Sequence, residues 1–175
     1  MSLEEIYQQF CKTRSDINEH LPILSSYAKG KIVTEFGVRK GVSTTALLRG
    51  RPKKLISYDI NIKRFNLNIM EAAKIEKINF SLIQADVLKI EIEPTDILFI
   101  DTLHTYEQLS QELAIHSEKV SDALILHDTT TFKYQGETKN SKGLNDAIQE
   151  FIANGIWKIK KEYINNNGLT ILERL

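Results

Sequence analysis

Short apolar runs alternate with amphipathic segments through most of the chain. KIVTEF, KLISYDI, NFSLIQADV, TDILFID and DALILHD each suit a buried strand. Four of them lead into a segment with helical spacing of its apolar residues, and the third leads into an acidic connection. DILFI and ALILH are apolar almost throughout, as expected of central strands buried on both faces. This repetition predicts a mainly parallel sheet with helices on both faces.

The two ends of the chain have patterns of their own. Ser2 and Glu5 have the spacing of a capping box that opens a helix, and Pro22 is well placed to start a second, short helix. Near the other end, WKIKKEYI and LTILERL flank NNNG and predict an antiparallel hairpin at one edge of the sheet. We expect a three-layer α/β fold with a seven-stranded sheet. The expected parts are helices in residues 1–29 and a core in residues 30–175, within a single domain of residues 1–175.

Composition narrows the class of protein. A chain of 175 residues, 42% of them hydrophobic, is long enough for one domain with a real core. Lys plus Arg equals Asp plus Glu at 23 each, so the overall charge favours neither a nucleic acid nor a lipid surface as partner. Cys11 is the only cysteine, which excludes an internal disulfide and a thiolate-rich zinc site. With an acidic start and no long apolar segment, we expect a cytoplasmic protein without a membrane partner. Its oligomeric state is open.

Polar side chains stand at the end of every predicted parallel strand. Because the carboxyl ends of parallel strands meet at one edge of a sheet, these side chains should share one rim, which is where open parallel sheets bind their ligands. Single acids at strand ends are common in turns, but five strand ends with an acid predict a functional site. The residues concerned are Glu35, Asp59, Asp86, Asp101, His127 and Asp128.

The loop after the first strand indicates what that site binds. Glu35, Gly37, Gly41 and Ser43 occur within nine residues, and glycine lets a backbone come close to a ligand or adopt positive φ angles. The spacing differs from the G-x-G-x-x-G of dinucleotide sites, which argues against an NAD or nucleotide-sugar enzyme. An acid would repel a pyrophosphate but would hold an ammonium group. The sequence therefore favours a ligand with a charged amine.

EFGVRKGVST resembles the first motif of class I S-adenosylmethionine-dependent methyltransferases. DILFIDTLHTYE followed by ALILHDT resembles the paired motifs of their small metal-assisted O-methyltransferases, in the branch that acts on sugars and antibiotics and in the catechol-type enzymes. The resemblance covers about residues 30–175. It implies a Rossmann-like methyltransferase fold, an S-adenosylmethionine cofactor and transfer of a methyl group.

The resemblance also assigns roles in cofactor binding. Glu35, Gly37 and Ser43 would hold the methionine part, and Asp59 would accept hydrogen bonds from both ribose hydroxyls, for which one carboxylate has enough oxygens. Asp86 would contact the adenine amino group, although a loop-capping role remains an alternative. The full set of cofactor-binding residues is Glu35, Gly37, Arg39, Gly41, Ser43, Asp59, Asp86 and Asp101.

The same resemblance gives Asp101, His127 and Asp128 as a metal group and His104 as a base, with Asp101, His104 and His127 as the catalytic residues. A free histidine has a pKa near 6.5, so His104 would be partly neutral at pH 7. His127 departs from the pattern because an oxygen ligand is common there, which weakens Mg²⁺ and leaves Mn²⁺, another divalent ion or no metal. In a structural alternative, Asp101 only orients the cofactor, while His127 and Asp128 cap a strand end and His104 caps a helix or packs under the loop.

Together these features predict an S-adenosylmethionine-dependent O-methyltransferase that acts on a hydroxyl of a small molecule or sugar. A non-catalytic S-adenosylmethionine-binding or interaction domain is the alternative, because the chain has no large insertion for recognising a substrate. Residues 129–143 are long and polar and follow the last parallel strand, so we predict that they form a mobile lid.

Overall fold

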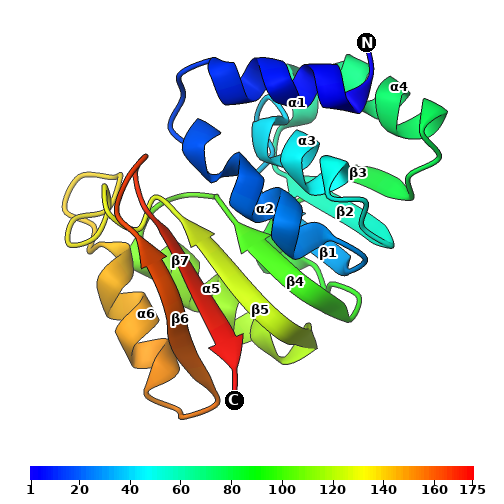
Figure 1. The fold of residues 1–175 in the computed structure, drawn as a ribbon. Coiled ribbons are helices and arrows are strands. Elements are labelled where there is room, and N and C mark those ends of the chain that lie inside the picture. Colours follow the sequence, from blue (N-terminus) through cyan, green and yellow to red (C-terminus); the bar gives the residue numbers. More distant parts are fainter.

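The computed structural model describes all 175 residues and contains one seven-stranded sheet, in the order β3-β2-β1-β4-β5-β7-β6. The first five strands are parallel to one another, and β7 is antiparallel to both β5 and β6 (Figure 1). The predicted C-terminal hairpin is therefore confirmed. The strands are β1 Ile32–Phe36, β2 Lys54–Asp59, β3 Phe80–Gln84, β4 Thr95–Ile100, β5 Val120–His127, β6 Trp157–Tyr163 and β7 Leu169–Arg174.

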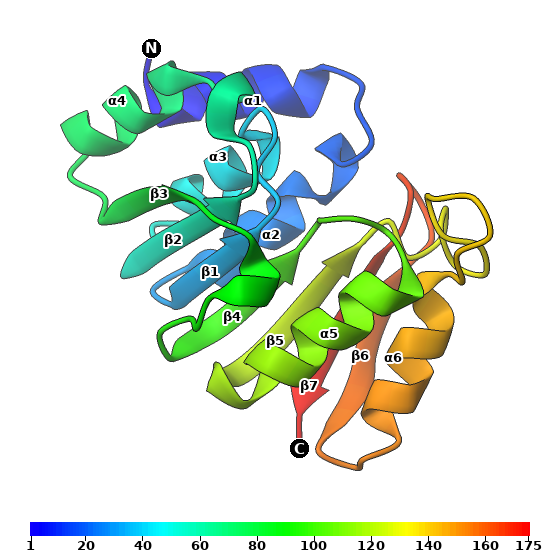
Figure 2. The ribbon, with the colours of Figure 1, turned by 180° about the vertical axis from the view of Figure 1, so that it is seen from behind.

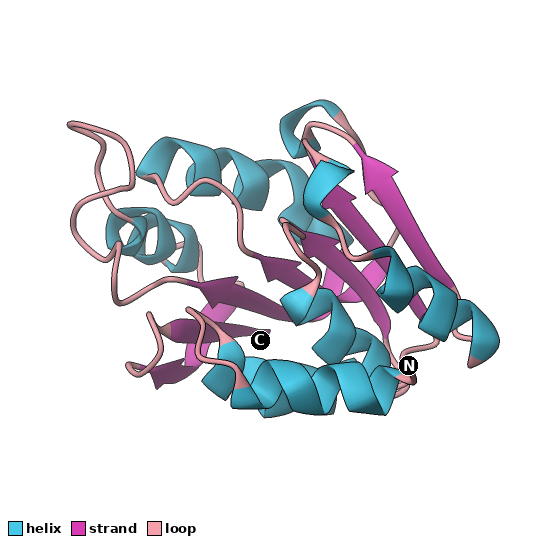
Figure 3. Ribbon diagram, turned by 90° about the horizontal axis from the view of Figure 1, so that it is seen from above, coloured by secondary structure: helices cyan, strands magenta, loops and turns pink.

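Helices cover both faces of the sheet, which confirms the three-layer prediction. Figure 2 shows α5 and α6 on one face, and α1 to α4 lie on the other; the view from above in Figure 3 shows the strands between the two layers. None of the helices has the length and apolar character needed to cross a membrane. The helices are α1 Leu3–Lys12, α2 Leu21–Ala28, α3 Val42–Arg49, α4 Leu67–Ile75, α5 Tyr106–His116 and α6 Leu144–Ile152, with 3₁₀ turns η1 Asn18–His20, η2 Ile62–Arg64, η3 Val87–Lys89 and η4 Ser117–Lys119.

Alternation along the central strands divides the core into two parts. In β4, Ile97 and Phe99 pack with the α1–α4 layer, whereas Leu98 and Ile100 pack with the α5–α6 layer. Side chains of successive residues in a strand point to opposite faces, so an apolar run such as DILFI supplies both cores at once. The carboxyl ends of β1, β2, β4 and β5 are thereby fixed along one rim.

Local sequence signals set the helix boundaries. Ser2 and Glu5 form the predicted capping box of α1, with Ser2 Oγ accepting from the Glu5 amide and Glu5 accepting from the Ser2 amide. Pro22 lies in the first turn of α2, where its missing N–H costs nothing. Thr105 caps α5 by accepting from the Gln108 amide. His104 is thus held in the short connection between β4 and the capped start of α5.

Candidate active site

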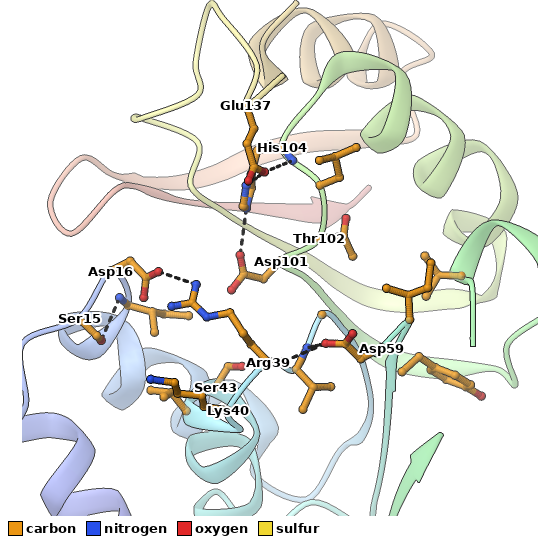
Figure 4. A pocket seen from close by; sticks show the side chains of 18 of the residues that line it. Ser15, Asp16, Arg39, Lys40, Ser43, Asp59, Asp101, Thr102, His104 and Glu137 are labelled. Carbon is orange, nitrogen blue, oxygen red and sulfur yellow. Dashed lines mark hydrogen bonds and ion pairs between the residues drawn. The ribbon is translucent and has the colours of Figure 1, made fainter. Parts of the chain in front are cut away.

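A cavity of about 810 Å³ opens at the carboxyl ends of the strands. Most of its walls come from four regions: residues 13–17 before η1, the loop after β1, the ends of β2 and β3, and the connection from β4 to α5; Glu137 adds a contribution from the loop of residues 129–143. Figure 4 shows Asp59 and Asp16 on opposite sides, with Arg39 between them and Asp101 above. The volume is in the usual range of sites for small molecules, roughly 300–1,000 Å³.

The two glycines of the first loop make room for the protein's own atoms. Gly37 has a φ of 82°, and a Cβ there would lie 1.9 Å from the carbonyl oxygen of Asp101. Gly41 has a φ of 86°, and its Cβ would lie 2.7 Å from the Phe65 ring and 2.6 Å from the Ile69 side chain. Gly37 lines the cavity and Gly41 does not. The expected close approach of a ligand to Gly41 is therefore replaced by close packing against Ile69 of α4 and Phe65, which directly follows η2.

Glu35 lies away from the cavity, contrary to the expectation that it contacts the ligand directly. It is fully buried beneath the start of α3, where hydroxyls of Ser43, Thr44 and Ser57 donate to its carboxylate over 2.5–2.8 Å. Burial raises its pKa to about 7, although these hydrogen bonds favour the charged form. Glu35 therefore stabilises the start of α3, directly after the first loop, through hydrogen bonds from Ser43 and Thr44. Ser43 does line the cavity, but its hydroxyl is engaged with Glu35.

Asp59 lines the cavity and also holds the first loop in place. Its Oδ2 accepts from the amides of Val38 and Arg39, at 2.8 and 2.9 Å, and its Oδ1 accepts from the Asn61 amide at 2.8 Å. A carboxylate offers about four acceptor positions. Asp59 therefore has room for about one further donor, rather than the two ribose hydroxyls expected, unless one of these turn bonds opens.

Asp86 and Arg39 both line the cavity and both have structural contacts. Asp86 caps η3 by accepting from the Leu88 amide, as the loop-capping alternative anticipated, and it forms an ion pair with Lys89 at 2.9 Å. Arg39 has a φ of 50°, and its guanidinium donates to Asp16 at 3.1 Å. Their roles in cofactor binding stay predictions.

The four predicted catalytic and metal-binding residues converge at the ends of β4 and β5. His104 Nε2 lies 3.2 Å from Asp101 Oδ1 and 2.9 Å from Asp128 Oδ2. His127 Nδ1 lies 3.2 Å from the same Asp101 oxygen and 3.3 Å from the same Asp128 oxygen. We call Asp101, His104, His127 and Asp128 the carboxylate–imidazole cluster. Asp101 and His104 line the main cavity, whereas His127 and Asp128 lie buried behind them.

Electrostatics in the carboxylate–imidazole cluster are strongly coupled. Burial opposes charge on each imidazole, but hydrogen bonds and charges of Asp101 and Asp128 outweigh it and raise the pKa of His104 and of His127 to about 10. Burial would raise the pKa of Asp101, but the charge of His127 and hydrogen bonds from both imidazoles lower it to about 2. The expectation of a partly neutral His104 at pH 7 is thus wrong for the cluster without a cation.

Each imidazole has an oxygen partner on its outer nitrogen. His104 Nδ1 lies 2.9 Å from Glu137 Oε2, and His127 Nε2 lies 3.2 Å from the carbonyl oxygen of Asp16. Protons on the outer nitrogens leave the lone pairs of neutral imidazoles facing Asp101 and Asp128, as in histidines that bind metals.

The donor set fits a divalent cation. Ligand atoms of Asp101, His104 and Asp128 lie within 4.8 Å of one another, and Asp128 Oδ1 is buried without a hydrogen-bond partner. A buried carboxylate oxygen without a partner is costly, and a cation would satisfy it. The geometry favours His104 in the ligand group where the sequence suggested His127. Two carboxylates and an imidazole suit Mn²⁺ better than Mg²⁺.

Sequence reasoning missed two residues at this site. Glu137 lies in the long loop of residues 129–143, stacked above the β4–α5 connection, and its amide donates to the His104 carbonyl at 2.9 Å. Asp16 lies in the N-terminal segment and reaches the cavity from the side opposite Asp59 (Figure 4). Neither stands at a strand end, so the strand-end pattern could not find them. The lid role of residues 129–143 stays a prediction.

No protein-family model matches the sequence, and no curated protein matches it significantly. Solved structures do match the fold. Magnesium protoporphyrin IX methyltransferase (ChlM) from Synechocystis PCC 6803, with bound S-adenosylhomocysteine, has a TM-score of 0.66 and 13% identity over 98% of this chain and 94% of its own. The chain has the class I methyltransferase fold. N-methyltransferase NodS from Bradyrhizobium japonicum WM9, also with S-adenosylhomocysteine, has a TM-score of 0.64 and 14% identity over 99% of both chains.

The methyltransferase fold agrees with the resemblance found in the sequence motifs. At these identities the likeness is one of architecture alone, and the two proteins named above differ in what they methylate. The acceptor and the chemistry must therefore be argued from the residues of this chain.

Proposed function

We propose that the protein is an S-adenosylmethionine-dependent methyltransferase that methylates a hydroxyl oxygen of a small molecule or sugar with the help of a divalent cation. The observation that carries the proposal is the carboxylate–imidazole cluster beside the cavity, at the point where β1 and β4 bring Gly37 and Asp101 together. A cofactor bound along the first loop would have its reacting end next to Asp101.

S-adenosylmethionine carries a methyl group that its sulfonium already makes electrophilic. The chain therefore has to orient donor and acceptor and deal with the proton of the hydroxyl. Asp59 and the first loop would hold the adenosine part, and Gly37 keeps that loop against the end of β4.

Asp101 has the oxygen best placed to receive the acceptor. Its Oδ1 is occupied by both imidazoles, whereas its Oδ2 has no hydrogen-bond partner in the protein, and the side chain lines the cavity. Asp128 Oδ1 is also without a partner but is buried. We therefore assign the hydrogen bond from the acceptor hydroxyl to Asp101 Oδ2.

Asp101, His104 and Asp128 would hold the cation, with His127 next to them. A cation there would lower the pKa of a coordinated hydroxyl, whose proton would then leave to the solvent in the cavity, and so would make the oxygen the better nucleophile. Without a cation, the raised pKa of His104 leaves Nε2 protonated and unable to take a further proton. Binding a cation requires that proton to leave, which makes the cation-loaded protein the active form in this proposal.

The test is a methyl-transfer assay that follows S-adenosylhomocysteine release over a panel of phenols, catechols, sugars and small alcohols, with an amine series for comparison. We expect turnover with a hydroxyl acceptor in the presence of Mn²⁺ or Mg²⁺, loss of turnover in chelator, and loss in Asp101→Asn. Turnover with amines alone would contradict O-methylation. Cofactor binding with no turnover on any acceptor would favour a non-catalytic S-adenosylmethionine-binding domain.

A further inference from the structure

Residues 13–17, between α1 and η1, form the wall of the cavity opposite Asp59 (Figure 4). The turn between β6 and β7 holds this wall in place. Asn166 Nδ2 donates to the Ser15 carbonyl at 2.7 Å, and Asn166 Oδ1 accepts from the Glu19 amide at 2.8 Å. His20 Nε2 contacts the Asn165 carbonyl at 3.0 Å. The asparagine-rich turn that the sequence marks as a hairpin thus fixes an N-terminal segment over the site.

A pair of opposite charges crosses the cavity at this wall. Asp16 Oδ2 lies 3.1 Å from Arg39 Nη1, and both residues line the cavity. The Asp16 side chain is 32% exposed and that of Arg39 is 69% exposed. The Asp16 main chain is fixed through His127, whose Nε2 meets the Asp16 carbonyl. An ion pair this exposed contributes little to stability, so a ligand can separate it at small cost.

The amino-acid end of S-adenosylmethionine needs one acid and one base. Glu35, the acid of the first loop, is sealed beneath α3 by three hydroxyls and does not reach the cavity. Asp59 and Asp86 stand at the other end, where the adenosine part would lie. On the far side of the first loop, where Arg14 and Lys40 also line the cavity, Asp16 and Arg39 are the acid and base that form an ion pair across it (Figure 4).

We propose that Asp16 binds the ammonium group and Arg39 the carboxylate of the cofactor's methionine part. The inference rests on the proposed function, because it presupposes that this cofactor occupies the cavity. A zwitterion brings both charges at once, so each member of the Asp16–Arg39 pair keeps an ionic partner when the ligand enters. The N-terminal segment then recognises the amino-acid end, and the first loop and Asp59 recognise the adenosine end.

Two ligands with an uncharged thioether sulfur separate the contribution of the amino-acid end from that of the adenosine end in a calorimetric titration. S-adenosylhomocysteine has the amino-acid end, and 5′-methylthioadenosine lacks it. We expect Asp16→Asn and Arg39→Gln each to weaken S-adenosylhomocysteine binding about tenfold or more, because each removes a charge-assisted contact, while 5′-methylthioadenosine binds as it does to the wild type. Asp122→Asn is the matched control, since it removes the acid of another exposed ion pair, with Lys31, and should change neither affinity.

If Asp16→Asn and Arg39→Gln weakened the binding of both thioethers equally, Asp16 and Arg39 would only support the wall, and the inference would be overturned. Unchanged S-adenosylhomocysteine binding in both variants would overturn it as well. A wild-type protein that binds neither thioether would instead refute the proposed cofactor. Thermal unfolding of each variant, compared with Asp122→Asn, shows whether the fold is retained, and 5′-methylthioadenosine binding reports an intact adenosine site.

Discussion

The carbonyl oxygen of Asp101 lies where a side chain on Gly37 would begin, 1.9 Å from the position of its Cβ. This contact joins the loop that follows β1 to the end of β4, and so sets the first loop against the carboxylate–imidazole cluster. It also explains a glycine that the sequence alone suggested was needed for a ligand.

Replacement of Gly37 by alanine should therefore destabilise the fold. Gly30 also has a positive φ, 67°, but a Cβ there meets nothing within 4 Å, so Gly30→Ala is a matched control that pays only the backbone cost of roughly 1–2 kcal/mol. We expect Gly37→Ala to lower the free energy of unfolding by clearly more than Gly30→Ala in urea titrations. An equal loss of unfolding free energy in the two variants would show that the backbone near Asp101 shifts to accommodate the Cβ at no cost.

The carboxylate–imidazole cluster should bind one divalent cation. We expect calorimetric titration of chelator-treated protein with Mn²⁺ to give a single site that Asp128→Ala abolishes, because this variant removes both the buried free oxygen and a ligand oxygen. Asp122→Asn, which lies in a surface ion pair with Lys31, is the control. Unchanged Mn²⁺ binding in Asp128→Ala would place the cation elsewhere, and absence of binding in the wild type would remove it from the proposal.

Glu137 should act as a positioning residue through His104. Its carboxylate contacts His104 Nδ1 at 2.9 Å and turns the other ring nitrogen towards Asp101 and Asp128. Loss of such an outer partner typically costs about 10- to 100-fold in metal affinity. Glu137→Gln should weaken Mn²⁺ binding in that range and leave S-adenosylhomocysteine affinity unchanged. The exposed Glu162 on β6 offers a neutral control, Glu162→Gln. A variant that binds Mn²⁺ like the wild type would exclude this role.

Buried Glu112 should make stability depend on pH. Burial raises its pKa from 4.5 to about 7, although Gln108 and Thr102 donate to it. The folded protein thus keeps a proton that the unfolded chain loses near pH 4.5. The contribution of this group to the free energy of unfolding therefore falls as pH rises from about 4.5 to about 7. By pH 8 the loss amounts to up to about 3 kcal/mol.

Glu112→Gln removes that contribution, so urea unfolding at pH 5 and pH 8 should show a smaller decrease in the variant than in the wild type. In Glu107→Gln, at an exposed position on the same helix, the free energy of unfolding should decrease between pH 5 and pH 8 as much as in the wild type. The same decrease in Glu112→Gln and wild type would contradict the assignment of this pH dependence to Glu112.

The sequence predicted the sheet because its apolar runs are long enough to identify and because a terminal hairpin has a strong local signal. It predicted the rim in part: Asp59, Asp86 and Asp101 line the cavity, and His127 and Asp128 come together with Asp101 and His104, whereas Glu35 does not reach it. Such predictions succeed because they depend only on the direction of parallel strands.

Glu35 was misplaced although a local pattern was available, and other features depend on tertiary contacts that no local pattern contains. Glu35 has the same strand parity as Val33, which faces the α1–α4 core, so alternation along β1 could have placed it underneath α3. Asp16 and Glu137 reach the cavity from connections distant in sequence, and only the packing of those connections brings them there. The pKa of His104 likewise follows from two carboxylates contributed by different strands.

Calorimetric titration with S-adenosylhomocysteine, run on the wild type, Asp59→Ala and Asp59→Asn, tests the central claim most directly. We predict one site in the wild type, binding weaker by about 1–3 kcal/mol in Asp59→Ala because a charged acceptor and the brace of the first loop are lost, and a milder effect in Asp59→Asn. No binding to the wild type, or binding of NAD in preference to S-adenosylhomocysteine, would contradict the account.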